Sequence, residues 1–144
     1  MKSVEITRVF DAPRAVVFGW WTEAGKLAQW SGCKDAVHCE IEMDFRVGGG
    51  FTQKMQLAGK GEFSFRATYE EIVAPEKIVY RAEIGGAMTR VTIRFFEEGT
   101  ATKVVLTHEG FPNEMFSKFV SQGTAESFDK LAAIVMRRDA VSRA

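Results

Sequence analysis

His108 is the residue whose position in the sequence most suggests chemistry. It is in phase with Val104 and Leu106 in an alternating run, which turns its imidazole toward the interior of a sheet. An inward imidazole can orient a polar ligand group or transfer a proton as an acid or base. The alternative is a hydrogen-bonded or rim histidine without a ligand, because strand ends often twist. In a pocket enzyme, Tyr69 or Glu109 would assist His108.

The other titratable and nucleophilic residues form no catalytic or metal-binding motif. His38 lies on the outward phase of its run, and two histidines without a supporting motif do not indicate a zinc or iron site. Five residues separate Cys33 from Cys39, which fits neither a redox pair nor half of a zinc site, so we expect two reduced thiols. No serine lies in a nucleophile elbow. The sequence therefore predicts no metal and no cofactor.

Large apolar side chains form the broader candidate site. Twelve phenylalanines and three tryptophans are a heavy aromatic load for 144 residues, and large rings either line or fill a wide interior. Sequence periodicity does not report the curvature of a sheet, so lining and filling remain alternatives. The candidates on inward phases are Trp30, Phe51, Met55, Phe63, Phe65, Tyr69, Tyr80 and Phe95.

Seven alternating runs must position these side chains. Alternation of apolar and polar residues predicts strands at 3–10, 37–43, 51–57, 62–73, 78–84, 90–95 and 102–108. Between the first two runs we expect two short helices, with Pro13 in the first turn and Asp11 or Ala12 as the cap.

Three consecutive glycines from Gly48 mark a bend between two strands, because glycine tolerates positive φ and close backbone approach. They lead into a strand and not into a helix, which argues against a phosphate loop. Asp44 and Arg46 precede them and could pin the bend by a surface ion pair, which contributes only about 0–1 kcal/mol.

One long amphipathic helix ends the chain. Asn113 is a credible cap, and one apolar stripe follows it over six turns. This stripe should face the sheet, so its middle residues join the candidate ligand site. The stripe consists of Phe116, Val120, Thr124, Phe128, Leu131 and Val135, of which Val120, Thr124 and Phe128 are the predicted ligand-binding residues.

Length and composition set the class of the protein. A chain of 144 residues fits one domain, residues 1–144, and shows no repeat or linker. Nineteen basic and nineteen acidic residues balance, which argues against nucleic acid as the main ligand. No apolar run of membrane-spanning length occurs, and the charged start differs from a signal peptide, so we expect a cytoplasmic protein. The sequence leaves a homodimer open.

The order of these elements and motifs resembles the helix-grip fold of the START and birch-pollen-allergen superfamily. Within it, the chain is similar to the family related to the C-terminal domain of the heat-shock-protein-90 ATPase activator. Nearly the whole chain takes part. The matching residues are Val9-Phe10-x-Ala12-Pro13, Val17-Phe18, Trp21-Thr22, Leu27-x-x-Trp30, Asp44-x-Arg46-x-Gly48-Gly49, Tyr69-x-Glu71-Ile72-x-x-Pro75-Glu76-x-Ile78, and Gly99-Thr100 with Thr102 and Leu106.

The resemblance implies an α+β fold in which a curved antiparallel seven-stranded sheet wraps around the long C-terminal helix. The family usually has Gly-Trp in that helix where this chain has Gly123-Thr124, so we expect extra volume or a wider mouth beside Thr124. A chaperone partner is implied by the resemblance alone.

Three functions are compatible with this sequence. The first is binding of a small hydrophobic or amphipathic molecule in an internal cavity, with Tyr69, Tyr80 and His108 as polar anchors. The second is a pocket enzyme resembling the superfamily's cyclases, hydrolases or dehydratases, with His108 as the acid or base. The third is a chaperone-cofactor or protein-interaction module, which would carry an exposed apolar patch.

Overall fold

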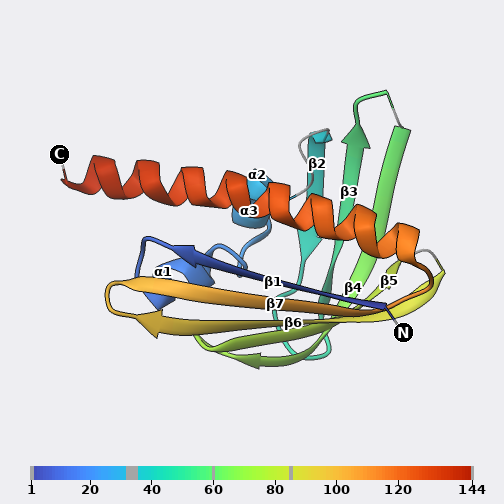
Figure 1. The fold of residues 1–144 in the computed structure, drawn as a ribbon, viewed down its shortest axis with the longest axis horizontal. Coiled ribbons are helices and arrows are strands. Elements are labelled where there is room, and N and C mark those ends of the chain that lie inside the picture. The colour runs from blue at the N-terminus through green and yellow to red at the C-terminus, as the bar shows by residue number, and fades with distance from the viewer. Residues whose placement is uncertain (1, 32–35, 60, 85, 144) are drawn as a thin grey trace.

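The computed structural model describes residues 2–31, 36–59, 61–84 and 86–143. In these residues seven strands form one antiparallel sheet in the order β1-β7-β6-β5-β4-β3-β2, and a long helix lies along its concave side (Figure 1). The predicted helix-grip architecture is therefore confirmed. The elements are β1 (Lys2–Phe10), α1 (Arg14–Gly19), α2 (Ala24–Trp30), β2 (Ala36–Met43), β3 (Gly50–Leu57), β4 (Gly61–Val73), β5 (Lys77–Ile84), β6 (Ala87–Glu98), β7 (Ala101–Phe111) and α3 (Glu114–Arg143).

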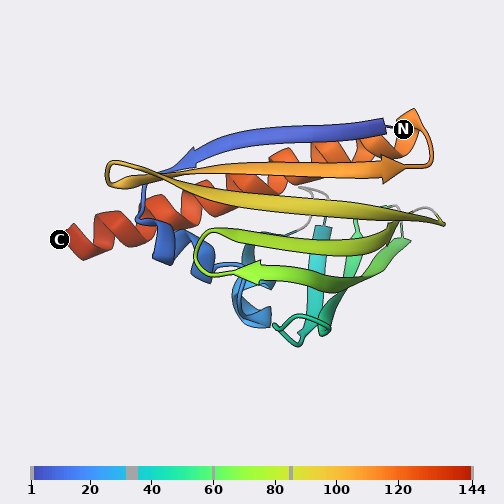
Figure 2. The ribbon, with the colours of Figure 1, turned by 90° about the horizontal axis from the view of Figure 1, so that it is seen from below.

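The sheet bends sharply along β4. The first part of this strand pairs with β3, from Gly61 to Thr68, and the second part pairs with β5, from Ala67 to Val73. The register shifts between Tyr69 and Glu71, which marks a bulge, and bulges increase the local bend of a strand. As a result β2 and β3 stand across α3, while β1, β7 and β6 run along it (Figures 1 and 2).

The glycines after Asp44 allow the β2–β3 connection to meet β4 closely. Gly48 has φ +86°, and a Cβ on Gly50 would collide with the carbonyl oxygen of Ala67. The Asp44 carboxylate accepts a hydrogen bond of 2.7 Å from Arg46 Nε, and both side chains are exposed. The bend is thus fixed mainly by backbone geometry, because such an exposed ion pair contributes only about 0–1 kcal/mol.

The two short helices close the space between the edge strands. Helix α2 packs against β2 and against α3, and α3 packs against β1. The predicted capping of α1 was wrong: Pro13 itself occupies the N-cap position in an extended conformation, and the helix begins at Arg14. Proline suits this place because it has no backbone N–H to satisfy.

Burial changes along the apolar stripe of α3. The Asn113 side chain caps the helix as predicted, since its Oδ1 accepts a hydrogen bond of 3.0 Å from the Phe116 N–H. Phe128 and Leu131 are fully buried, whereas Val120 and Thr124 are only partly buried although they share the same face. The helix therefore packs tightly on β1 and α2 in its middle and stands away from the sheet in its first half.

Candidate functional site

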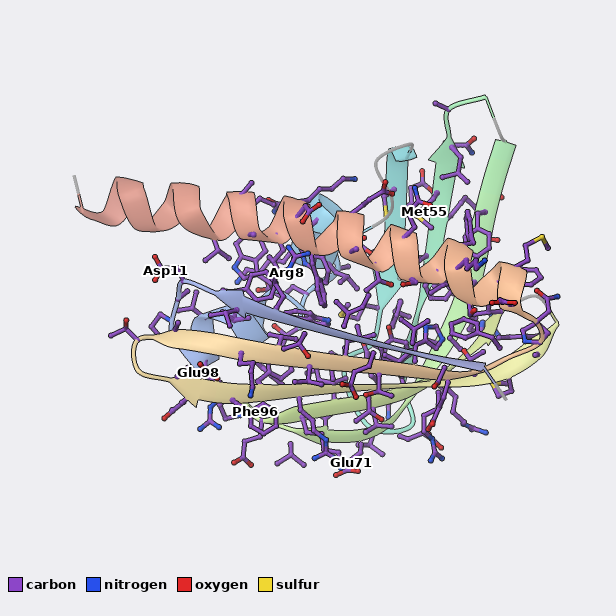
Figure 3. The ribbon with its side chains drawn as sticks, viewed as in Figure 1. Arg8, Asp11, Met55, Glu71, Phe96 and Glu98 are labelled. Carbon is purple, nitrogen blue, oxygen red and sulfur yellow. The ribbon has the colours of Figure 1, made fainter. Side chains whose placement is uncertain are left out.

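A cavity of about 140 Å³ lies between the first half of α3 and the bent sheet. Its walls come from α2, from β3 to β7 and from α3. Eleven of the twelve side chains predicted from the sequence line it, and Figure 3 places one of them, Met55, on the upright part of β3. These eleven are Trp30, Phe51, Met55, Phe63, Phe65, Tyr69, Tyr80, His108, Val120, Thr124 and Phe128.

Phe95 is the predicted residue that does not line the cavity. It points inward as expected and is 1% exposed, but its ring lies against Phe18 and Trp21 at centroid distances of 5.1 and 5.0 Å. Phe18 of α1 and Trp21 of the connection between α1 and α2 fill this end of the interior with rings. The prediction failed because the phase of a strand residue does not say which element covers it.

The cavity also has walls that the sequence analysis did not single out. Gln53 lines the cavity and shares the inward phase of Phe51 and Met55 in β3. The alternation of this strand is therefore a signal in the sequence that predicts its inward position. Phe119 also lines the cavity, but it lies beside the predicted apolar stripe of α3. The spacing of that stripe therefore does not predict its position. The other additional lining residues are Trp21, Leu27, Ser31, Ala82, Ile84, Val91, Leu106, Gly123 and Ser127.

His108 is the most constrained polar group of the cavity. It is 6% exposed, and its Nε2 lies 2.7 Å from the hydroxyl oxygen of Thr89. The same hydroxyl donates to the carbonyl oxygen of Ala82 at 2.6 Å. On its other side the imidazole lies against the ring of Phe111, with centroids 4.4 Å apart. Burial lowers the pKa of His108 to about 4, so the imidazole is neutral at physiological pH.

Tyr69 of β4 and Tyr80 of β5 are register partners beside the bulge, with ring centroids 6.1 Å apart. Burial raises the pKa of both hydroxyls, and Tyr80 raises the pKa of Tyr69 further, so both stay protonated. Neither hydroxyl has a hydrogen-bond partner among the described residues. Tyr80 is partly buried and lines the cavity.

Gln53 and Cys39 meet at the α2 side of the cavity. Gln53 is 4% exposed, and its amide nitrogen donates to the hydroxyl of Ser31 at 2.8 Å and to Cys39 Sγ at 3.6 Å. Burial raises the pKa of the Cys39 thiol, although the hydrogen bond from Gln53 lowers it in part. Cys39 is therefore a protonated thiol, as expected, whereas Cys33 and the side chain of His38 lie outside the described residues.

Two rings border the cavity where α3 passes the β3–β4 hairpin. Phe63 in β4 and Phe119 in α3 meet at a centroid distance of 5.6 Å, and Phe119 is 41% exposed. Both residues line the cavity. Because one ring belongs to the sheet and the other to the helix, this pair forms an outer wall between the cavity and the surface.

Outside the cavity, Glu109 does not join His108. It is exposed on the opposite face of β7, where its register partner is Arg90. Figure 3 shows two further side chains on this outer face, Glu71 and Phe96, which project away from α3. Among the described residues, no helix is long and apolar enough to span a membrane.

Comparisons with known proteins place this chain in a family. A family profile described as "Activator of Hsp90 ATPase homolog 1-like protein" matches residues 11–136. No curated protein matches the chain significantly.

Solved structures share the fold over nearly the whole chain. A protein from Rhizobium loti is 27% identical, with a TM-score of 0.76, and the match covers 92% of this chain and 95% of that one. A protein from Chromobacterium violaceum is 23% identical with a TM-score of 0.81, over 92% and 96%. The AHSA1 protein from Silicibacter pomeroyi is 18% identical with a TM-score of 0.78, over 95% and 99%. Since the profile spans most of the sequence, the chain belongs to the family of Activator of Hsp90 ATPase homolog 1-like proteins.

Proposed function

We propose that this protein binds one small hydrophobic or amphipathic molecule in the cavity between α3 and the bent sheet. The observation that carries the proposal is the change of burial along one helical stripe, from fully buried Phe128 to half-buried Thr124 and Val120. Side chains of an ordinary core close such a gap, because protein interiors pack at the density of organic crystals.

The size of the cavity limits the ligand. A volume of about 140 Å³ is close to the roughly 150 Å³ of an apolar cavity that holds benzene, and below the roughly 300 Å³ at which pockets for larger ligands begin. A single ring of six to eight heavy atoms is therefore the expected scale of the guest. Tyr69, Tyr80 and His108 offer it polar contacts, and the surrounding rings offer apolar surface.

Toluene provides a direct test of this proposal. Titration calorimetry should show saturable binding to the wild-type protein. Thr124→Trp should abolish that binding, because the indole would enter the cavity beside Gly123. Lys118→Trp is the matched control, since Lys118 is exposed on the same helix, and it should leave the affinity unchanged. Absence of toluene binding to the wild type, or equal loss in both variants, would contradict the proposal.

The geometry gives less support to acid–base catalysis by His108. A pKa of about 4 means that His108 is a neutral imidazole near pH 7: it lacks the acidic proton of the imidazolium form, and it is a weak base. Glu109, the carboxylate considered as its helper, lies on the other face of the strand. We therefore propose binding as the function, with the link to a chaperone resting on the family alone.

A further inference from the structure

We infer that the cavity selects an uncharged, ring-sized molecule bearing a hydrogen-bond donor, such as a phenolic hydroxyl, and that Nδ1 of His108 accepts this hydrogen. The inference rests on the proposed function, because it names the class of ligand for the same cavity. It follows from the hydrogen bonds that fix the tautomer of one buried histidine, and from the uncharged side chains of the described residues that line the cavity.

The first step concerns the proton of Thr89. A carbonyl oxygen can only accept, so the 2.6 Å contact between Thr89 Oγ1 and the Ala82 oxygen requires the hydroxyl hydrogen. A threonine hydroxyl has one hydrogen, and its oxygen must therefore accept in the 2.7 Å contact with His108 Nε2. The Nε2 atom of His108 is thus the protonated nitrogen of the ring.

The second step concerns the other ring nitrogen. In a neutral imidazole with hydrogen on Nε2, Nδ1 carries a lone pair and acts as an acceptor. Among the described residues Nδ1 has no hydrogen-bond partner. Within the same residues, Arg14 Nε is the one fully buried side-chain nitrogen or oxygen without a partner. Nδ1 of His108 consequently keeps accessible surface, and His108 lines the cavity.

The third step concerns charge. The described residues that line the cavity include no Asp, Glu, Lys or Arg. A charged ligand group would lose its hydration there without gaining an opposite charge, which is strongly unfavourable. A neutral hydroxyl or amine N–H can instead be satisfied by one acceptor, and buried polar groups are nearly always satisfied in this way.

Phenol and toluene test the inference as a pair, since the two rings have similar size and only phenol carries a donor. In wild-type protein phenol should bind at least as tightly as toluene. In His108→Leu the ratio of the phenol to the toluene dissociation constant should rise at least about tenfold, because the hydroxyl then loses its acceptor. Toluene should still bind this variant.

The outcomes separate the two proposals. If neither probe binds the wild type, the proposed function itself fails. If both probes bind and the ratio is the same in wild type and His108→Leu, the cavity exists and the assignment of the acceptor is overturned.

A measurement on the wild type keeps the inference testable if His108→Leu does not fold. The ¹⁵N resonances of the His108 ring, assigned by comparison with His108→Gln, should show hydrogen on Nε2 and none on Nδ1 at pH 7. Saturating phenol should shift the Nδ1 resonance, and toluene should shift it less. A ring protonated at Nδ1, or an Nδ1 resonance that phenol leaves unmoved, would overturn the inference.

Discussion

The ring of Phe10 in β1 meets the ring of Phe128 in α3 edge to face, with centroids 5.6 Å apart and an interplanar angle of 84°. Both side chains are fully buried, with exposed fractions of 1% and 0%. The contact anchors the middle of α3 on the edge of the sheet. Phe128 also borders the cavity, which extends from this contact toward Thr124 and Val120 in the first half of the helix.

Phe128→Ala should therefore lower the free energy of unfolding by about 3–5 kcal/mol, the usual cost of removing a buried ring. Val120→Ala, in the same stripe on the cavity side, should cost only about 1 kcal/mol, because Val120 is only partly buried. Urea denaturation of both variants checks the contrast. Equal losses would show that α3 is packed equally tightly at both positions.

Thr89→Val should destabilise the protein although valine has nearly the shape of threonine. Thr89 is 1% exposed, and its loss leaves the Ala82 carbonyl oxygen and His108 Nε2 without their shared partner. We expect a loss of about 1–3 kcal/mol in the free energy of unfolding. Thr92→Val is the control on the same strand, because no side-chain hydrogen bond of Thr92 occurs among the described residues, and it should change stability by less than about 0.5 kcal/mol.

The stability of the protein should depend on pH through His108. Burial lowers its folded-state pKa from the ordinary 6.5 to about 4. Between these values the unfolded chain binds a proton that the folded protein does not, so the stabilisation is complete above pH 6.5 and is lost as the pH falls to 4. The total effect is about 3 kcal/mol, since each pKa unit corresponds to about 1.4 kcal/mol.

Unfolding free energies of wild type and His108→Gln at pH 7, 5.5 and 4 isolate this contribution, because all other groups are shared. The difference between the two proteins should shrink by about 3 kcal/mol over the range. A difference that stays constant with pH would mean that His108 titrates normally in the folded state.

Gly50→Ala should be one of the most damaging small substitutions. The added methyl would collide with the carbonyl oxygen of Ala67 in the neighbouring strand, which forces β3 and β4 apart and costs about 1–3 kcal/mol or more. Gly25→Ala in α2 is the matched control, since nothing lies within 4 Å of its added Cβ. It should stabilise the protein by about 0.5–1 kcal/mol. Thermal melts that rank the two variants in the opposite order would contradict the role assigned to Gly50.

Much of the fold could be read from local patterns. Alternation in the runs ending at Phe10, Met43 and His108 predicts strands because side chains alternate between the two faces of a strand. The stripe from Phe116 to Val135 predicts the long helix by its spacing, and the cap at Asn113 follows from residue type. These features depend on residues that are close in the sequence, so they can be predicted without knowledge of the tertiary structure.

The composition of the cavity wall was also largely predictable, because inward phase is a local property. Gln53 shares the inward phase of Phe51 and Met55 in β3, and it lines the cavity with them although it is polar. Phe95 shows the limit: its phase is inward, but α1 and the connection that follows it supply the rings that cover it.

The sequence by itself determined which side chains point inward, since that depends on the two-residue and 3.6-residue periods of strand and helix. Only the tertiary structure decided where the interior is filled and where it is hollow. That depends on the bend at the Tyr69 bulge, on the distance at which α3 passes it, and on the proton of Thr89 that turns His108 into an acceptor. Each of these joins residues far apart in the chain, and no local pattern carries their geometry.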